Sequence, residues 1–134
     1  VFYRALQDRL GVPTGRIVNE YGMTELLSQF YEPVMRDGAP EADGDPSERR
    51  HVAPPWVRTR VLDPGDLGEL PPGEPGLLCH VDLANAGSVA AVLTEDMGVA
   101  VADGFRVLGR AAGAEPRGCS LAMDELLGAA GEGR

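Results

Sequence analysis

The spacing of apolar and polar positions predicts a short helix at the start of the chain. Between Phe2 and Leu10, the apolar residues Leu6 and Leu10 recur at the interval that places them on one helical face, with polar residues between them. Gly11 and Pro13 follow directly, and both residue types end helices. We therefore expect an amphipathic helix that ends at Leu10.

The next stretch predicts a strand, a turn and a second helix. Residues 17–18 are apolar and are expected to form a short strand that leads into a turn over residues 19–25. From residue 24 to about residue 31 the pattern is helical. Pro33 ends this helix because proline has no amide hydrogen to donate.

Charged residues mixed with glycine and proline predict an exposed loop over residues 36–55. This loop separates an α/β segment, residues 1–35, from a β-rich segment, residues 56–110. Residues 111–134 form the last part of the chain. Within it, a short helix is expected over residues 120–127.

Short apolar runs in the β-rich segment predict a series of strands. Asp103-Gly104, between the last two runs, is a strong signal for a tight hairpin turn. The class is therefore α/β. The expected strands are residues 56–62, 77–83, 88–93, 97–101 and 105–108.

Composition and charge argue against two classes of partner. The net charge is -9 and the pI is about 4.6, a poor match for the basic clusters that bind nucleic acid or anionic membranes. No apolar run approaches the roughly 20 residues of a membrane span. Two cysteines without zinc spacing favour a reducing cytoplasm. Because only 5% of residues are aromatic, we expect a mainly aliphatic core.

The segment Tyr21-Gly22-Met23-Thr24-Glu25 has the residue types that a nucleotide site needs. Tyr21 offers a flat apolar surface for a base, and Gly22 permits close backbone approach. Thr24 at a helix N-terminus would place a hydroxyl near phosphate, and Glu25 would offer a carboxylate to Mg²⁺. The alternative is an ordinary strand-to-helix turn in which Thr24 caps the helix, since short motifs match by chance.

Residues 18–25 resemble the central motif of the adenylate-forming superfamily, which includes acyl-CoA synthetases, peptide-synthetase adenylation domains and luciferases. The stretch through residue 31 is similar to one branch, the acyl-protein synthetases of bacterial luminescence, relatives of the phenylacetate-CoA ligases. Residues 93–96, 103–105 and 108–110 follow in order and resemble the superfamily's ribose-binding strand, hairpin and Gly-Arg element.

The resemblance implies a site for ATP and Mg²⁺ spread over both segments. Tyr21 would stack on adenine, Thr24 would bind the α-phosphate and Glu25 would hold Mg²⁺. Asp96 would accept hydrogen bonds from the ribose hydroxyls, which a carboxylate does well. Arg110 would contact the ribose or the phosphate. Taken alone, Asp96 is also compatible with a solvated turn residue.

The sequence departs from the superfamily pattern in three ways. Glu95 stands where a glycine is usual, and a Gly-rich phosphate loop is absent. A catalytic lysine is absent too, because Arg117 and Arg134 are the only basic residues after Arg110. We therefore expect the C-terminal part of an adenylate-forming domain, a strand-helix unit with a small β-barrel-like subdomain and a hinge-like last segment. This fragment is expected to be inactive alone.

Cys119 is a candidate acyl acceptor. The luminescence acyl-protein synthetases, as a family, are acylated on a cysteine near the C-terminus, and Cys119 is the cysteine in such a position here. Arg117 and a following helix N-terminus would lower its pKa and favour the nucleophilic thiolate. The alternative is a small buried residue under the helix. Cys79, in a strand, is expected in the core.

The remaining polar and aromatic candidates receive structural interpretations. We expect His51 to be solvated in the loop and His80 to be partly exposed on a strand, since neither has metal-ligand spacing. Trp56 is expected to anchor the β-rich segment. Asp82 and Asn85 flank a turn and are expected to form hydrogen bonds within it.

The resemblance implies that the full-length protein is a ligase that activates a carboxylic acid, most simply a fatty acid, as an acyl-adenylate and passes the acyl group to a protein cysteine. An acyl- or aryl-CoA ligase is the alternative within the same chemistry. A non-catalytic fragment with a degenerate nucleotide site is the alternative outside it. The expected partners are the acid, coenzyme A or an acyl-donor or acyl-acceptor protein.

Overall fold

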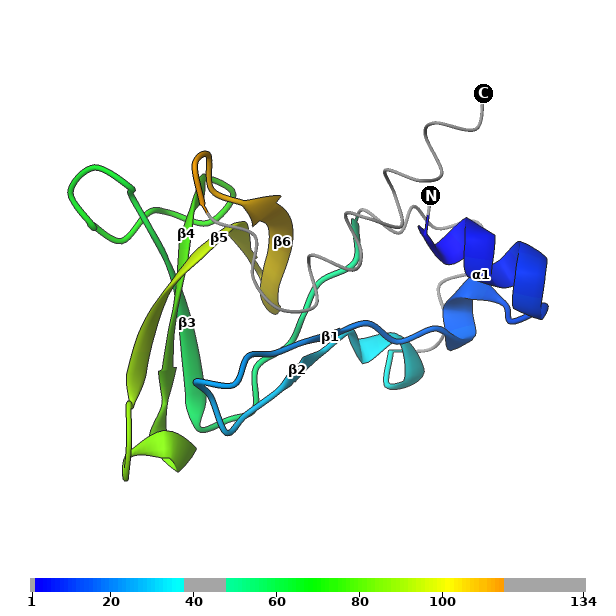
Figure 1. Cartoon of the computed structure of the whole chain (residues 1–134), viewed down its shortest axis with the longest axis horizontal. Helices are drawn as coiled ribbons and strands as arrows, with labels where there is room; N and C mark the ends of the chain where they lie inside the picture. The colour runs from blue at the N-terminus through cyan, green and yellow to red at the C-terminus, as the bar shows by residue number, and fades with distance from the viewer. Residues whose placement is uncertain (1, 38–47, 115–134) are drawn as a thin grey trace.

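A computed structural model describes residues 2–37 and 48–114 (Figure 1). The first element is the helix expected from the apolar spacing, and its bounds are confirmed as Phe2–Leu10. Within the described residues, 3₁₀ turns and short strands follow, and the longer strands come after them. The elements in order are α1 (Phe2–Leu10), η1 (Thr14–Arg16), β1 (Glu20–Tyr21), β2 (Phe30–Tyr31), η2 (Pro33–Met35), β3 (Val57–Leu62), β4 (Pro75–Asp82), η4 (Leu83–Asn85), β5 (Ala91–Val101) and β6 (Gly104–Arg110).

The strands form two antiparallel sheets: the small sheet, β1-β2, and the large sheet, β3-β4-β5-β6. A connector of two residues joins them: Val52 pairs with Tyr31 at the end of β2, and His51 pairs with Phe105 in β6. The small sheet therefore lies beside the large one through this connector, while α1 lies at the far end of the molecule (Figure 1). The expected α/β class, with helix and antiparallel sheet combined, is confirmed.

The stretch between β1 and β2 is not helical, so the prediction of a helix over residues 24–31 was wrong. The strand predicted at residues 17–18 is absent there, and the structure has a strand three residues later, at β1. Leu26, Ser28 and Phe30 are buried and the residues between them are exposed, which is the two-residue period of an extended chain. Ser28 is polar although it is buried, so the sequence does not show the two-residue alternation of apolar and polar residues that predicts an extended chain.

β5 is one strand of 11 residues where two strands, 88–93 and 97–101, were predicted. Its pairing with β4 shifts between Leu77 and Cys79, so residues 94–96 bulge out of the ladder. The other predicted strands agree with β3, β4 and β6 to within a few residues. The Asp103-Gly104 hairpin between β5 and β6 is also confirmed.

The centre of the core is aromatic. Six buried residues form its cluster: Leu26, Phe30, Val57, Val61, Leu78 and Phe105. The rings of Phe30 and Phe105 meet edge to face with centroids 5.2 Å apart, and they are the largest fully buried side chains. The expectation of an aliphatic core holds by number but misses these two rings, which connect the small sheet to β6.

Both histidines are buried, contrary to the sequence expectation. His51 is 6% exposed and His80 is not exposed at all. The His80 ring lies 4.6 Å from Phe30, centroid to centroid, and its Nδ1 is 3.0 Å from the Thr59 hydroxyl. Its Nε2 and both ring nitrogens of His51 have no hydrogen-bond partner among the described residues. Burial lowers the pKa of both imidazoles, that of His80 to about 4.

Trp56 does not anchor the β-rich segment by burial, because it is 51% exposed. Its indole Nε1 donates a hydrogen bond to the Ser28 hydroxyl over 2.9 Å.

The described end of the predicted loop, residues 48–55, is structured. The side chain of Arg49 is 8% exposed and forms a salt bridge of 3.1 Å with Glu32, which is itself buried. The guanidinium also donates to the carbonyls of Thr14 and Ile17 and lies 4.5 Å over the ring centroid of Tyr3. Arg49 thus connects the α1–η1 region to the segment that leads into β3.

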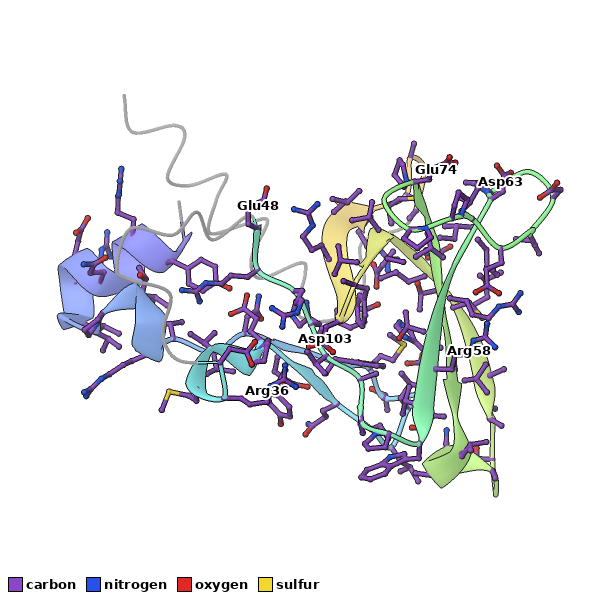
Figure 2. The ribbon with its side chains drawn as sticks, turned by 180° about the vertical axis from the view of Figure 1, so that it is seen from behind. Arg36, Glu48, Arg58, Asp63, Glu74 and Asp103 are labelled. Carbon is purple, nitrogen blue, oxygen red and sulfur yellow. The ribbon has the colours of Figure 1, made fainter. Side chains whose placement is uncertain are left out.

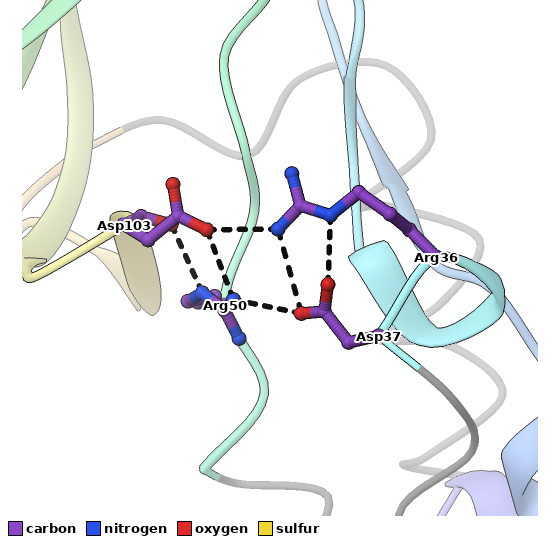
Figure 3. A network of polar contacts seen from close by, with 4 residues as sticks. All are labelled: Arg36, Asp37, Arg50 and Asp103. Carbon is purple, nitrogen blue, oxygen red and sulfur yellow. Dashed lines mark hydrogen bonds and ion pairs between the residues drawn. The ribbon is translucent and has the colours of Figure 1, made fainter.

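A surface network of four charged residues links the segment after β2 to the β5–β6 hairpin. Arg36 and Arg50 both donate to the carboxylates of Asp37 and Asp103, over distances of 2.7 to 3.0 Å (Figure 3). The two guanidinium groups hold the pKa of the Asp103 carboxyl below its usual value. Because these groups are exposed, solvent and salt screen the network.

None of the helices in the described part of the chain has both the length and the apolar character needed to cross a bilayer.

The buried histidines predict a loss of stability in mild acid. The folded state holds His80 neutral, with a pKa of about 4 against the usual 6.5, so the unfolded state binds more protons between these two values. The free energy of unfolding should fall by up to about 3 kcal/mol as the pH drops from roughly 6.5 to 4. Urea unfolding across this range would measure it.

His80→Phe should remove most of this pH dependence, because the phenyl ring keeps the aromatic packing and does not titrate. Thr59→Val serves as the control, since it removes the neighbouring hydroxyl but keeps the titrating ring. An unchanged pH slope in His80→Phe would contradict the assignment.

Candidate functional site

Three of the residues predicted to bind nucleotide form one hydrogen-bonded cluster. Tyr21 in β1 donates its hydroxyl to Asp96 Oδ2 over 2.7 Å, although the two residues are 75 positions apart in the chain. Arg110, at the end of β6, donates from Nη1 to Asp96 Oδ1 over 3.0 Å. Asp96 and Arg110 are also direct partners in the β5–β6 register. The two sequence motifs, residues 18–25 and residues 93–110, therefore meet at Asp96.

The bulge in β5 determines where the Asp96 side chain lies. Within the bulge, the Thr94 hydroxyl donates to the backbone carbonyl of Leu78 in β4 over 2.9 Å. The same hydroxyl accepts from the Asp96 amide over 3.1 Å. Thr94 thus replaces ladder bonds that the bulge removes, and such bulges commonly redirect a side chain next to a functional site. Thr94 was part of the predicted motif, but its role was not foreseen.

The charge of the cluster is negative. Arg110 donates to Glu95 Oε2 over 2.8 Å as well as to Asp96, so two carboxylates share one guanidinium. The Asp96 side chain is 16% exposed, whereas Glu95 is open to solvent. A carboxylate has about four lone-pair positions. Asp96 therefore retains capacity to accept from hydroxyl groups of a ligand.

Tyr21 is fixed by aromatic neighbours. The rings of Phe30, His51, His80 and Phe105 lie around it, with centroids 5.7 to 5.9 Å away. Burial and the hydrogen bond to Asp96 raise the pKa of the Tyr21 phenol far above its usual value. The phenol therefore stays protonated and acts as a hydrogen-bond donor.

Thr24 and Glu25 lie in the turn between β1 and β2, and both are exposed. Thr24 is not at a helix N-terminus, so the predicted reason for its role was wrong. Gly22 is also exposed, and a Cβ added there would come within 2.5 Å of the Glu20 carboxylate. The turn adjoins the Tyr21 cluster along the chain, while no described hydrogen bond links the Thr24 or Glu25 side chain to Asp96.

Two buried polar residues bind the β1–β2 turn to the end of β4: Asp82, which precedes η4, and Asn85, the last residue of η4. Asp82 accepts from the backbone amide and the hydroxyl of Ser28, and Asn85 donates to the backbone carbonyl of Glu25. The predicted hydrogen bonds within their own turn are confirmed, from the Ala84 amide to Asp82 and from Asn85 to the Val89 carbonyl. The contacts with the motif turn were missed, because nothing in the local sequence indicates them.

Cys119 and the expected helix over residues 120–127 lie outside the described residues. Cys79, which is described, is half-buried, and burial raises the pKa of its thiol. A thiol with a raised pKa is a poor nucleophile near neutral pH.

The described residues contain no group of three or more His, Cys, Asp or Glu side chains that could hold a metal ion. Mg²⁺ is often bound by one or two carboxylates together with substrate phosphates. The exposed carboxylate of Glu25 fits that mode, in which the ion arrives with a nucleotide.

Solved structures of adenylate-forming enzymes are similar to this chain. ATP-bound MatB from Rhodopseudomonas palustris aligns with a TM-score of 0.55 and 25% identity, over 81% of this chain and 22% of that one. The luciferase-like enzyme of the mealworm Zophobas morio has the same TM-score and coverage of this chain, with 21% identity over 28% of its own length. At 21% identity, the similarity to the Zophobas morio enzyme shows a shared fold and no more.

Sequence relatives give a closer assignment. The long-chain-fatty-acid–luciferin-component ligase of Aliivibrio fischeri is 33% identical over 84 residues, which are 63% of this chain and 19% of the relative. The ligase of the same description from Vibrio harveyi is 30% identical over 94 residues, 65% of this chain and 25% of the relative. The chain thus spans a quarter or less of either relative. Residues 1–128 match the family model described as acyl-protein synthetase, LuxE. The chain belongs to this acyl-protein synthetase family.

Proposed function

We propose that the protein carrying this chain activates a long-chain fatty acid with ATP and transfers the acyl group to a cysteine thiol. In the first step, a carboxylate oxygen of the acid bonds to the α-phosphorus of ATP and pyrophosphate leaves. In the second, a thiolate sulfur bonds to the acyl carbon and AMP leaves. The observation that supports this most is the meeting of Tyr21, Asp96 and Arg110 in a chain of the acyl-protein synthetase family.

Asp96 is proposed to hold the ribose of the nucleotide. Its two oxygens are oriented by Tyr21 and Arg110, and its remaining lone pairs can accept from two ribose hydroxyls. Because the carboxylate is only 16% exposed, such bonds would form in a site with little competing water. Arg110 would hold the Asp96 carboxylate in place and would lie beside the sugar or the phosphate.

Tyr21 is proposed to support adenine. Its ring is held by four aromatic or imidazole neighbours and its hydroxyl is bonded to Asp96, so the base and ribose contacts would be fixed relative to each other. Such preorganisation lowers the entropic cost of binding.

Thr24 and Glu25 are proposed to face the phosphates. The Thr24 hydroxyl would donate to the α-phosphate, and Glu25 would contact the Mg²⁺ that accompanies ATP. When bound, the ion would neutralise charge that develops on phosphorus as pyrophosphate leaves. Both side chains are exposed and so are accessible to a polyphosphate.

Fatty-acid-dependent exchange of labelled pyrophosphate into ATP tests the activation step in the full-length protein. Asp96→Ala should lower the exchange rate by roughly 100-fold or more, because it removes the ribose acceptor and the carboxylate to which Tyr21 and Arg110 donate. Asp63→Ala is the control, since Asp63 closes a turn after β3, the edge strand of the large sheet on the other side from β6. Absence of exchange with every carboxylic acid would favour a degenerate nucleotide site.

The acceptor is tested separately. In the full-length protein, labelled fatty acid should form a hydroxylamine-labile adduct that Cys119→Ser abolishes, while pyrophosphate exchange continues. Persistent labelling of Cys119→Ser would exclude Cys119 as the acceptor. Turnover that depends on coenzyme A and survives this substitution would select the acyl-CoA ligase alternative.

The hydroxyl of Tyr21 should matter more than that of Tyr31. Tyr21→Phe removes a partly buried hydrogen bond to a carboxylate and should lower the free energy of unfolding by about 1–2 kcal/mol. It should also weaken ATP binding, because Asp96 loses a group that orients it. Tyr31→Phe is the matched control, since its hydroxyl bonds locally to Gln29 at the surface. Equal effects of the two substitutions would contradict the assignment.

A further inference from the structure

The β1–β2 turn is attached to the large sheet by a buried carboxylate. Asp82 has no exposed surface and sits at the end of β4, where it precedes η4. Its Oδ2 accepts from the Ser28 amide over 2.9 Å, and its Oδ1 accepts from the Ser28 hydroxyl over 3.0 Å. Oδ1 also accepts from the Ala84 amide over 2.9 Å. These donors are neutral, so hydrogen bonds rather than an ion pair hold the carboxylate in place.

Asn85 makes the second attachment. Asn85 is 7% exposed, and its side-chain amide donates to the backbone carbonyl of Glu25 over 2.7 Å. The same Nδ2 donates to the carbonyl of Val89 over 3.0 Å. Asn85 therefore bridges the motif turn and the segment before β5, and it contacts the very residue whose carboxylate is proposed to meet Mg²⁺.

Ser28 and Trp56 complete the arrangement. The Ser28 hydroxyl donates to Asp82 and accepts from the Trp56 indole over 2.9 Å. The backbone of the turn is thus held at Glu25 and at Ser28, on either side of the buried Leu26. Thr24 lies directly before this held stretch.

A buried carboxylate is a costly way to stabilise a turn. Desolvation of a charged group costs several kcal/mol, and an apolar pair of similar shape often gives equal or greater stability. Unlike apolar packing, hydrogen bonds are directional, so they fix the positions of the backbone atoms that they contact. The side chain of Glu25 is exposed, so the hydrogen bond to its backbone carbonyl fixes the point from which that side chain projects.

We propose that Asp82 and Asn85 are positioning residues that hold Glu25, in the β1–β2 turn, in the geometry for binding Mg²⁺ with ATP. The proposal rests on the proposed function and adds to it the residues that orient the metal-binding carboxylate. Neither residue would touch the nucleotide. Asn85 acts through the carbonyl of Glu25, and Asp82 acts through Ser28.

The test compares binding of ATP with and without Mg²⁺ by calorimetry, using the full-length protein. Asn85→Asp keeps the size of the side chain but replaces the amide donor with a carboxylate that repels the Glu25 carbonyl. We expect the Kd for Mg·ATP to rise about tenfold, with a change of less than about twofold for metal-free ATP. In pyrophosphate exchange, the Mg²⁺ midpoint should rise and added Mg²⁺ should restore most of the rate.

Asp63→Asn is the matched control. Asp63 accepts from the amides of Gly65 and Asp66 in the turn after β3, as Asp82 does in the turn after β4. It lies at the opposite end of the β3–β4 pair from η4 (Figure 2). This variant should leave the Mg²⁺ dependence unchanged. Ser28→Ala, which keeps the amide bond to Asp82, should give a smaller shift than Asn85→Asp and covers the case in which Asn85→Asp does not fold.

A double-mutant cycle with Glu25→Gln separates positioning from stability. If Asn85 acts through Glu25, Asn85→Asp should add no further loss of Mg·ATP affinity once Glu25 is Gln. Equal weakening of ATP with and without Mg²⁺, or additive losses in the double variant, would overturn the proposal. Mg·ATP binding without any acid-dependent exchange would instead contradict the proposed ligase activity and leave the binding test of positioning intact.

Discussion

The pairing of His51 with Phe105 is the contact on which the site depends. The two residues exchange both backbone hydrogen bonds, of 2.7 and 3.0 Å, and so join the connector to β6. Gly104 permits this approach, because its φ is +128° and a Cβ there would collide with the His51 carbonyl. Val52 then pairs with β2, which brings the small sheet to the large one. Without this closure, Tyr21 would not reach Asp96.

Closure also explains the buried polar groups. Folding the small sheet over Phe105 encloses His51 and His80, and it places Ser28 against Asp82. Of these, Asp82 has each oxygen bonded, whereas the histidines keep ring nitrogens without described partners. The hydrogen bonds of Asp82 define the position of the groups that donate to it. Burial of the histidines lowers the imidazole pKa and so makes the free energy of unfolding depend on pH. The two kinds of burial therefore have different consequences.

Local signals predicted local structure well. The α1 helix, the Asp103-Gly104 hairpin and the positions of β3, β4 and β6 follow from periodicity and turn chemistry within a few neighbouring residues. The continuous β5 does not, because its bulge interrupts the apolar pattern. The β1–β2 turn was misjudged because its two-residue period includes Ser28, a polar residue that is buried only when Asp82 reaches it from 54 positions away. The burial of His51 has the same origin in a distant contact. The Tyr21–Asp96–Arg110 cluster was predicted as a shared site, but its direct hydrogen bonds were not.

The charge of the site implies that a nucleotide would need a cation to bind well. Glu95 and Asp96 share the guanidinium of Arg110, so the cluster has an excess of negative charge, and the chain as a whole has a net charge of -9. ATP is itself a polyanion, and repulsion between like charges in a partly desolvated site is strong. A divalent ion held between Glu25 and the phosphates would reverse this repulsion. The position of Glu25 would then matter as well as its charge, and the Asn85 side chain donates to the backbone carbonyl of that residue.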